Sequence, residues 1–116
     1  MKLEDQVSSI EASMMLKELE VKQDSYFSWI LSKSTGRVLL SPSHLILTRR
    51  YERLCSAFTV AELGEMLKYN LQLYYTDHDE DYHITAFGKA VFFTDSKEAD
   101  ARAKMLIYLK EKEIKK

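Results

Sequence analysis

The chain has 116 residues, of which 46% are hydrophobic and 30% charged, a composition typical of one globular domain with one core. Its formal net charge of −1 excludes a global electrostatic attraction to nucleic acid or to anionic membranes. The apolar runs are far shorter than the ~20 residues that span a bilayer, and the first residues lack the apolar core of a signal peptide. We therefore expect a cytoplasmic protein without a membrane partner, folded as a single α+β domain over residues 1–116, with about 1–7 and 113–116 frayed.

The first predicted element is a helix over about residues 9–20. Ser8 and Glu11 have the spacing of a capping box, in which a hydroxyl and a carboxylate accept hydrogen bonds from backbone donors at the start of a helix. An apolar stripe with helical spacing follows, and it consists of Ala12, Met15, Leu16 and Leu19. This stripe is expected to face the core.

A β-hairpin is predicted next. Residues 26–31 are rich in aromatic and β-branched side chains, residues 32–36 form a polar loop that ends in glycine, and residues 37–40 return the chain. Successive side chains of a strand point to opposite faces. We predict that the buried face is the one that carries Phe27, Trp29 and Leu31.

Residues 41–57 fit no single pattern, because Pro42 interrupts the strand and residues 44–47 suit either a short strand or a helical turn. The segment carries a local basic cluster of Arg49, Arg50 and Arg53, which share one side at helical spacing. Such a cluster suits contact with an anion, including nucleic-acid phosphate. A solvated surface, or pairing with the acidic segments, is the favoured alternative.

The second helix is predicted over about residues 60–68. Thr59 and Glu62 form a capping box, and Phe58 before the cap is placed to pack on Leu63 as a hydrophobic staple. Gly64 in the helix interior costs roughly 1 kcal/mol relative to alanine. We therefore expect a neighbouring element to pack closely against the helix there.

Three strands of an antiparallel meander are predicted over about residues 71–76, 82–87 and 90–94. A last helix over about 97–112 follows Asp95 and Glu98, which repeat the capping spacing. Its inner stripe consists of Ala99, Ala103, Leu106, Ile107 and Ile114, widened by Met105 and Leu109. The elements predict an α+β fold in the order α-β-β-α-β-β-β-α, with an antiparallel sheet of four or five strands and about three helices.

No pattern in the sequence indicates a catalytic or cofactor-binding site. Cys55 is interpreted as a core residue rather than a reactive thiol. The acidic run 77–81, with His78 and His83, is interpreted as a solvated hairpin tip rather than a metal site, because its spacing matches no known metal-binding loop. Core packing is likewise favoured over base stacking for the strand aromatics Tyr74, Tyr75, Tyr82, Phe92 and Phe93.

Residues 58–67 (FTVAELGEML) and 98–109 (EADARAKMLIYL) resemble the paired signatures of a family of small proteins encoded by phages, prophages and bacterial mobile elements. Residues 16–29 are similar to the family's opening, where a glycine commonly stands in place of Glu20. Because this departure removes the usual helix-ending residue, the first helix is expected to end differently. More distantly, the chain is similar to phage proteins described as α-β-α sandwiches. The resemblance implies a genomic setting and supplies no activity, cofactor or site residue.

The leading functional hypothesis is a non-enzymatic accessory protein of a phage or prophage that binds another macromolecule, in first place a protein, with self-association as an option. The alternative is a nucleic-acid-binding module that uses Arg49, Arg50, Arg53 and exposed aromatic side chains. An enzyme is less favoured, because neither Cys55 nor any serine lies in a recognisable catalytic motif.

Overall fold

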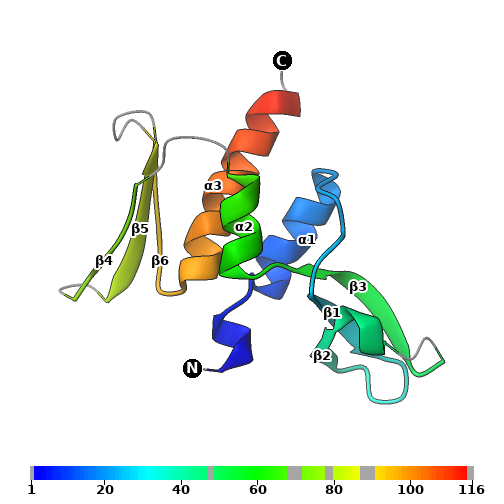
Figure 1. Cartoon of the computed structure of the whole chain (residues 1–116). Coiled ribbons are helices and arrows are strands. Elements are labelled where there is room, and N and C mark those ends of the chain that lie inside the picture. Colours follow the sequence, from blue (N-terminus) through cyan, green and yellow to red (C-terminus); the bar gives the residue numbers. More distant parts are fainter. Residues whose placement is uncertain (1, 47–48, 68–71, 78–79, 87–90, 115–116) are drawn as a thin grey trace.

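The computed structural model describes residues 2–46, 49–67, 72–77, 80–86 and 91–114 (Figure 1). The elements in chain order are the 3₁₀ helix η1 (Leu3–Asp5), α1 (Ile10–Glu18), β1 (Phe27–Ser32), β2 (Val38–Pro42), the 3₁₀ helix η2 (Ser43–Leu45), β3 (Tyr51–Ala57), α2 (Val60–Met66), β4 (Gln72–Thr76), β5 (Asp81–Ala86), β6 (Val91–Asp95) and α3 (Glu98–Ile114). The ambiguous region 41–57 thus contains the end of β2, η2 and β3.

The described strands form two antiparallel sheets of three strands, with the orders β2-β1-β3 and β4-β5-β6. The α+β class is confirmed, whereas the predicted single sheet of four or five strands is wrong. The predicted element order is wrong too, because β3 adds a third strand between α1 and α2. The three α-helices lie between the two sheets (Figure 1), so strands on opposite sides are too far apart to exchange backbone hydrogen bonds. The alternation of side chains along a strand predicts which residues share a face, but it does not predict which other strands pair with that strand.

Helix α3 occupies the centre of the molecule. It packs against β5 and β6 on one side and against α1 and α2 on the other. Ala99, Ala101, Ala103 and Met105 are therefore all fully buried, although they lie on different faces of the helix. The side chain of Ile114, predicted to face inward, lies outside the described residues. Because the sheets flank the helices, the radius of gyration is 15.0 Å, against about 13 Å for a compact chain of this length.

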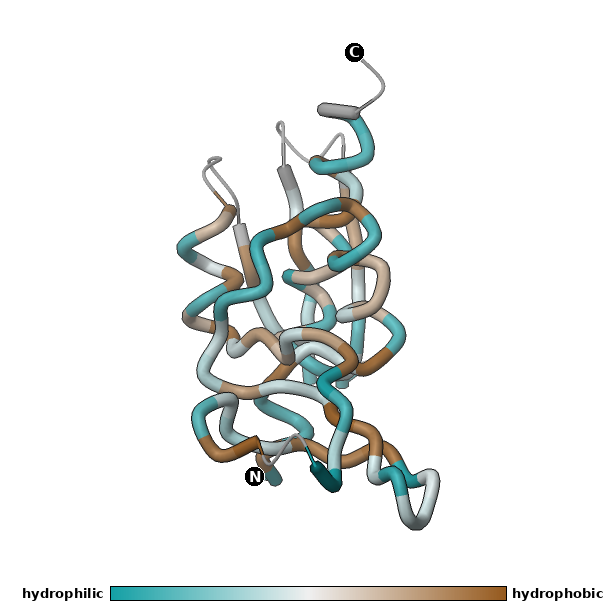
Figure 2. Tube along the Cα trace, turned by 90° about the vertical axis from the view of Figure 1, so that its right-hand side faces the viewer, coloured by the Kyte–Doolittle hydropathy of each residue, from teal (hydrophilic) through white to brown (hydrophobic). Residues whose placement is uncertain are grey.

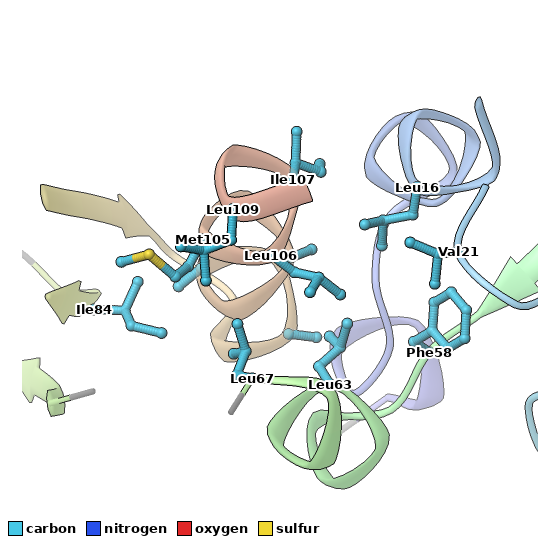
Figure 3. Packing of buried hydrophobic residues seen from close by; sticks show 13 residues of the cluster. Leu16, Val21, Phe58, Leu63, Leu67, Ile84, Met105, Leu106, Ile107 and Leu109 are labelled. Carbon is cyan, nitrogen blue, oxygen red and sulfur yellow. The ribbon is translucent and has the colours of Figure 1, made fainter. Parts of the chain in front are cut away.

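The apolar core lies on both sides of α3. Figure 3 shows Met105 pointing toward Ile84 of β5, while Leu106 lies on the side of Leu63 of α2. Phe58, just before α2, belongs to the same buried cluster. In Figure 2, apolar stretches occur both in the helical layer and in the lower sheet. The buried cluster thus joins the three helices to the sheet β4-β5-β6.

The start of α1 differs from the predicted one. Ser9 precedes the helix, and its hydroxyl accepts a hydrogen bond from the N–H of Ala12 at 3.2 Å. Ser8, predicted as the cap, is fully buried, with its hydroxyl 2.7 Å from that of Ser13 and accepting from the N–H of Phe58 at 3.0 Å. Ser8 therefore joins the N-terminal segment to the chain before α2.

The end of α1 has the geometry of a glycine-terminated helix. Glu20 has φ 63°, the Val21 N–H donates to the Leu16 carbonyl at 3.1 Å, and the Glu20 N–H donates to the Lys17 carbonyl at 3.0 Å, which together form a Schellman motif. Leu16 and Val21 are both buried in the core, and a hydrophobic contact between these two positions often accompanies this motif. The expected difference at Glu20 is therefore not observed. Met15, predicted to face the core, is 45% exposed.

Helix α2 begins as predicted. Thr59 and Glu62 form both hydrogen bonds of the capping box, and Phe58 and Leu63 are both fully buried. A Cβ atom on Gly64 would lie 3.1 Å from Nη1 of Arg102 in α3. The close neighbour that this glycine predicted is therefore α3.

The predicted capping box at the start of α3 does not form. Asp95 is the last residue of β6, and its carboxylate accepts from the N–H of Lys97 at 3.0 Å and pairs with Lys104 at 2.9 Å. Glu98 is the first helical residue and pairs with Arg102 at 3.4 Å. Asp95 thus closes the turn between β6 and α3.

The central strand of the first sheet buries the face opposite to the predicted one. The partly covered positions are Phe27, Trp29 and Leu31, and the buried ones are Ser28, Ile30 and Ser32. The polar positions can be buried because they have partners: the hydroxyl of Ser28 lies 2.7 Å from that of Ser43 in η2. On the other face, the indole N–H of Trp29 donates to the Ser8 carbonyl at 3.0 Å.

Candidate functional site

A groove of about 900 Å³ lies where the N-terminal segment, the start of α2, the β4–β5 turn and the β6–α3 turn converge. Its apolar and aromatic lining consists of Leu3, Phe27, Val60, Ala61, Tyr75 and Tyr82. Its charged rim consists of Asp5, Glu80, Lys97 and Glu98. In Figure 1 this region is at the lower end of the helical layer, beside the N-terminus. We call this feature the groove.

Local contacts fix the walls of the groove. The N-terminal segment is held by an antiparallel bridge between Val7 and Thr59, and Val7 is fully buried. On the opposite wall, Tyr75 and Tyr82 are cross-strand partners whose ring centroids are 4.9 Å apart. Tyr75 is nevertheless 47% exposed. The groove therefore has a firm apolar wall that remains accessible to a ligand.

The rim of the groove is acidic. Three carboxylates and one ammonium group give these four residues a net charge of −2. Lys97 and Glu98 have partners in α3, because Lys97 lies 3.8 Å from Asp100 and Glu98 pairs with Arg102. A cationic ligand is therefore favoured over an anionic one.

No motif in the sequence marked the groove. The sequence predicts only that helices begin after Thr59 and after Asp95, and the chain next to each of these residues lines the groove. The meeting of those two stretches of chain with the N-terminal segment depends on how α2 packs against α3.

The structure separates the three arginines that the sequence grouped. Arg49 and Arg50 are exposed in a turn, whereas Arg53 lies in β3, so the helical spacing that would align them does not occur. The guanidinium of Arg53 donates to the hydroxyls of Ser28 at 2.9 Å and Ser56 at 2.8 Å. It also donates to the Gln23 carbonyl at 2.9 Å. Arg53 therefore holds the first sheet together.

Two other cations join Arg49 and Arg50. The backbone N–H of Lys33 donates to the Arg50 carbonyl at 2.9 Å, and Arg37 lies at the other end of the same hairpin turn, where its carbonyl accepts from Ser32. All four residues are exposed. We call Lys33, Arg37, Arg49 and Arg50 the basic tip. Figure 2 shows the turn at 49–50 in deep teal at the lower end of the molecule.

The aromatic side chains of the second sheet divide between its two faces. Phe93 and Tyr82 pack against the core, and Tyr75 lines the groove. On the outer face, the ring of His83 stacks with Tyr74 at 5.0 Å and with Phe92 at 5.5 Å between centroids. The rings stand in a row with faces turned to one another. A nucleic-acid base needs an open ring face, so this row is a poor stacking platform.

Cys55 is buried with 1% of its surface exposed, as predicted for a core residue. Desolvation raises the pKa of its thiol, and the nearby charges of Lys17 and Arg53 only partly oppose this effect. The thiol is therefore protonated and shielded, which is the reverse of what a nucleophile requires.

Metal-binding residues are not gathered in the described ranges: no three His, Cys, Asp or Glu side chains there are placed to hold an ion. His78 and Asp79 of the acidic run lie outside those ranges, so the choice between a solvated tip and a metal site remains a prediction. His83 is buried on the second sheet, with Nε2 3.0 Å from the Thr76 hydroxyl.

Within the described residues, no helix has the length and apolar character needed to cross a membrane. Comparisons of the chain with protein-family models, with curated proteins and with solved structures find no match. The groove and the basic tip are therefore the features on which a functional proposal rests.

Proposed function

We propose that this chain is a small non-enzymatic accessory protein that binds a segment of another protein in the groove. The observation that carries the proposal is the groove itself, which has an apolar lining and an acidic rim. Its volume of about 900 Å³ lies at the upper end of the roughly 300–1,000 Å³ range of ligand pockets. A groove of this size suits a short peptide segment.

The chemistry of the groove defines the segment. Tyr75, Tyr82 and Phe27 offer ring surfaces on which aliphatic or aromatic side chains lose contact with water. Asp5 and Glu80 are exposed at the rim, where they can pair with lysine or arginine. The ligand is therefore an apolar stretch flanked by basic residues.

A phage or prophage setting, in the cytoplasm of the bacterial host, belongs to the same proposal. It rests on residues 58–67 and 98–109, the two segments that resemble the phage family. They contain all of α2 and most of α3, and the two helices contact each other at Gly64 and Arg102. These segments act as packing determinants, so the setting comes from the resemblance and the binding role from the groove.

A peptide-display selection on the whole chain tests the groove. We expect the recovered peptides to combine lysine or arginine with apolar or aromatic residues, and Ala61→Arg to abolish their binding by filling and charging the groove. Met14→Arg is the matched control, because it adds the same charge to an exposed position on α1 outside the groove. Absence of enriched peptides, or peptides that bind both variants equally, would contradict the proposal.

Nucleic-acid binding through the basic tip is the second candidate. Lys33 and Arg37 strengthen it by joining Arg49 and Arg50, while the engagement of Arg53 and the stacked row of Tyr74, His83 and Phe92 weaken it. Neutralising Z phosphates of a single strand gives a salt slope of about −0.7Z. Binding to single-stranded DNA that falls with this slope for Z near four, and disappears in Arg49→Glu/Arg50→Glu, would support it. Absence of binding at low salt would remove it.

A further inference from the structure

The groove and the basic tip lie at opposite ends of one strand. Phe27, at the start of β1, lines the groove, and Ser32, at its end, leads into the hairpin turn of the basic tip. Five steps along a strand span roughly 17 Å. The tip points away from the helical layer in Figure 1. A molecule therefore cannot insert its tip into its own groove.

The two features are complementary in charge. The basic tip carries four cationic residues, whereas the four charged residues of the groove rim have a net charge of −2. The whole chain carries only −1, so two copies barely repel each other at long range. Opposite charges at separate ends of a nearly neutral molecule favour head-to-tail contact.

The apolar surfaces match as well. Val38 follows Arg37 in the tip and is 44% exposed. The groove offers Leu3, 38% exposed, and Tyr75 as partners for such a side chain. The end of the first sheet thus has the chemistry expected of the groove's ligand: an exposed apolar side chain among basic residues.

We propose that the groove binds the basic tip of a second copy of this chain, so that copies associate head to tail. The inference rests on the proposed function of the groove and names its partner. Each copy uses two different surfaces, so the contact is heterologous and produces either a closed ring or an open filament. The groove and tip of every interior copy are then both occupied.

Mixing two variants tests the head-to-tail arrangement. Ala61→Arg blocks the groove and leaves the tip intact, whereas Arg49→Glu/Arg50→Glu reverses the tip and leaves the groove intact. In sedimentation velocity, the wild type should form oligomers larger than dimers that grow with concentration, and each variant alone should be monomeric. An equimolar mixture should form a 1:1 dimer and nothing larger, because only one competent groove and one competent tip remain.

Salt and charge reversal give independent readouts. The association constant of the wild type should fall at least about tenfold between 0.1 M and 1 M salt, over which the Debye length shrinks from about 10 Å to 3 Å. Adding Asp5→Lys/Glu80→Lys to the tip variant should restore self-association. Thermal unfolding of every variant checks that it is folded; these substitutions lie at exposed positions.

Three results would overturn the inference: a wild type that stays monomeric at low salt, a mixture that stays monomeric, or a tip variant that still self-associates. If the wild type is monomeric while display-selected peptides still bind in the groove, self-association fails and the proposed function stands. If neither occurs, both fail. A monomeric wild type whose tip binds single-stranded DNA would assign the tip to nucleic acid instead.

Discussion

The two sheets have the same number of strands but are held by different forces. In the sheet β4-β5-β6, Ile84 lies in the apolar core, and Leu73, Tyr82 and Phe93 pack against it. In the sheet β2-β1-β3, the central strand buries serines, and the guanidinium of Arg53 ties the sheet to Gln23. Hydrophobic burial is non-directional, whereas a buried hydrogen bond needs each partner in place. We therefore expect the first sheet to open locally at lower free energy than the second.

The largest effect should come from the shared core. Leu106→Ala removes a side chain that is 2% exposed, and we expect it to lower the free energy of unfolding by about 2–5 kcal/mol. Met15→Ala is the matched control, because Met15 is 45% exposed and its truncation leaves no buried cavity. Urea unfolding of both variants measures the difference. Equal losses would show that α3 is not the centre of the core.

Arg53→Met should destabilise only the first sheet, by about 1–3 kcal/mol, because Ser28 and Ser56 lose a charged hydrogen-bond partner. Cys55 is the single cysteine and lies in β3, so its labelling by a thiol reagent reports opening of this sheet.

We expect labelling of Cys55 to accelerate in Arg53→Met and to stay unchanged in Arg49→Met, whose side chain is exposed in a turn. The effect of Arg53 on the pKa of the Cys55 thiol acts against the expected increase in labelling rate, so that increase cannot come from the pKa change. Arg53 lowers the pKa of the Cys55 thiol, so its removal alone raises that pKa and slows labelling of the closed state. An unchanged rate in Arg53→Met would mean that its hydrogen bonds do not hold the sheet.

Ser8 and Ser9 should respond differently to truncation, since one links elements and the other caps a helix. Ser8→Ala leaves the buried N–H of Phe58 without its acceptor, which costs about 1–3 kcal/mol. Ser9→Ala removes a helix cap, which costs about 0.5–2 kcal/mol.

Hydrogen exchange separates the two roles. Ser8→Ala should raise exchange at the junction between the N-terminal segment and the chain before α2, whereas Ser9→Ala should affect the first turn of α1. The reverse pattern would restore Ser8 as the cap.

The smallest predicted effect is an increase in stability. Glu20→Gly relieves the steric cost of a left-handed residue at the end of α1, and we expect stability to rise by about 1 kcal/mol. Glu20→Ala keeps the strained backbone while removing the charge, and should give no gain. Thermal unfolding measures both; equal gains would assign the effect to charge rather than to backbone geometry.

Local interactions explain which predictions hold. The Thr59–Glu62 capping box and the close neighbour of Gly64 are confirmed, because the first depends on residues three positions apart and the second on the absence of one side chain. The predicted buried face of β1 is wrong, because the side with the larger aromatic side chains is not the side that the fold covers. Ser28 is buried there because Ser43 and Arg53, distant in sequence, satisfy its hydroxyl.

The candidate site was predictable only in fragments. Arg49 and Arg50 stand out in the sequence as a basic cluster, but the pairing of β1 with β3 is needed to bring Lys33 beside Arg50 and the guanidinium of Arg53 beside Ser28. The groove has no sequence signature, since it forms where four separate chain segments meet.

The sequence by itself determined the α+β class, the start of α2 and the buried character of α3, because capping and helical periodicity act between residues a few positions apart. The tertiary structure alone decided that the strands form two sheets instead of one, and that acidic and basic surfaces lie at opposite ends of β1. Those outcomes depend on which elements α3 separates, and contacts between distant segments are not encoded in any local pattern.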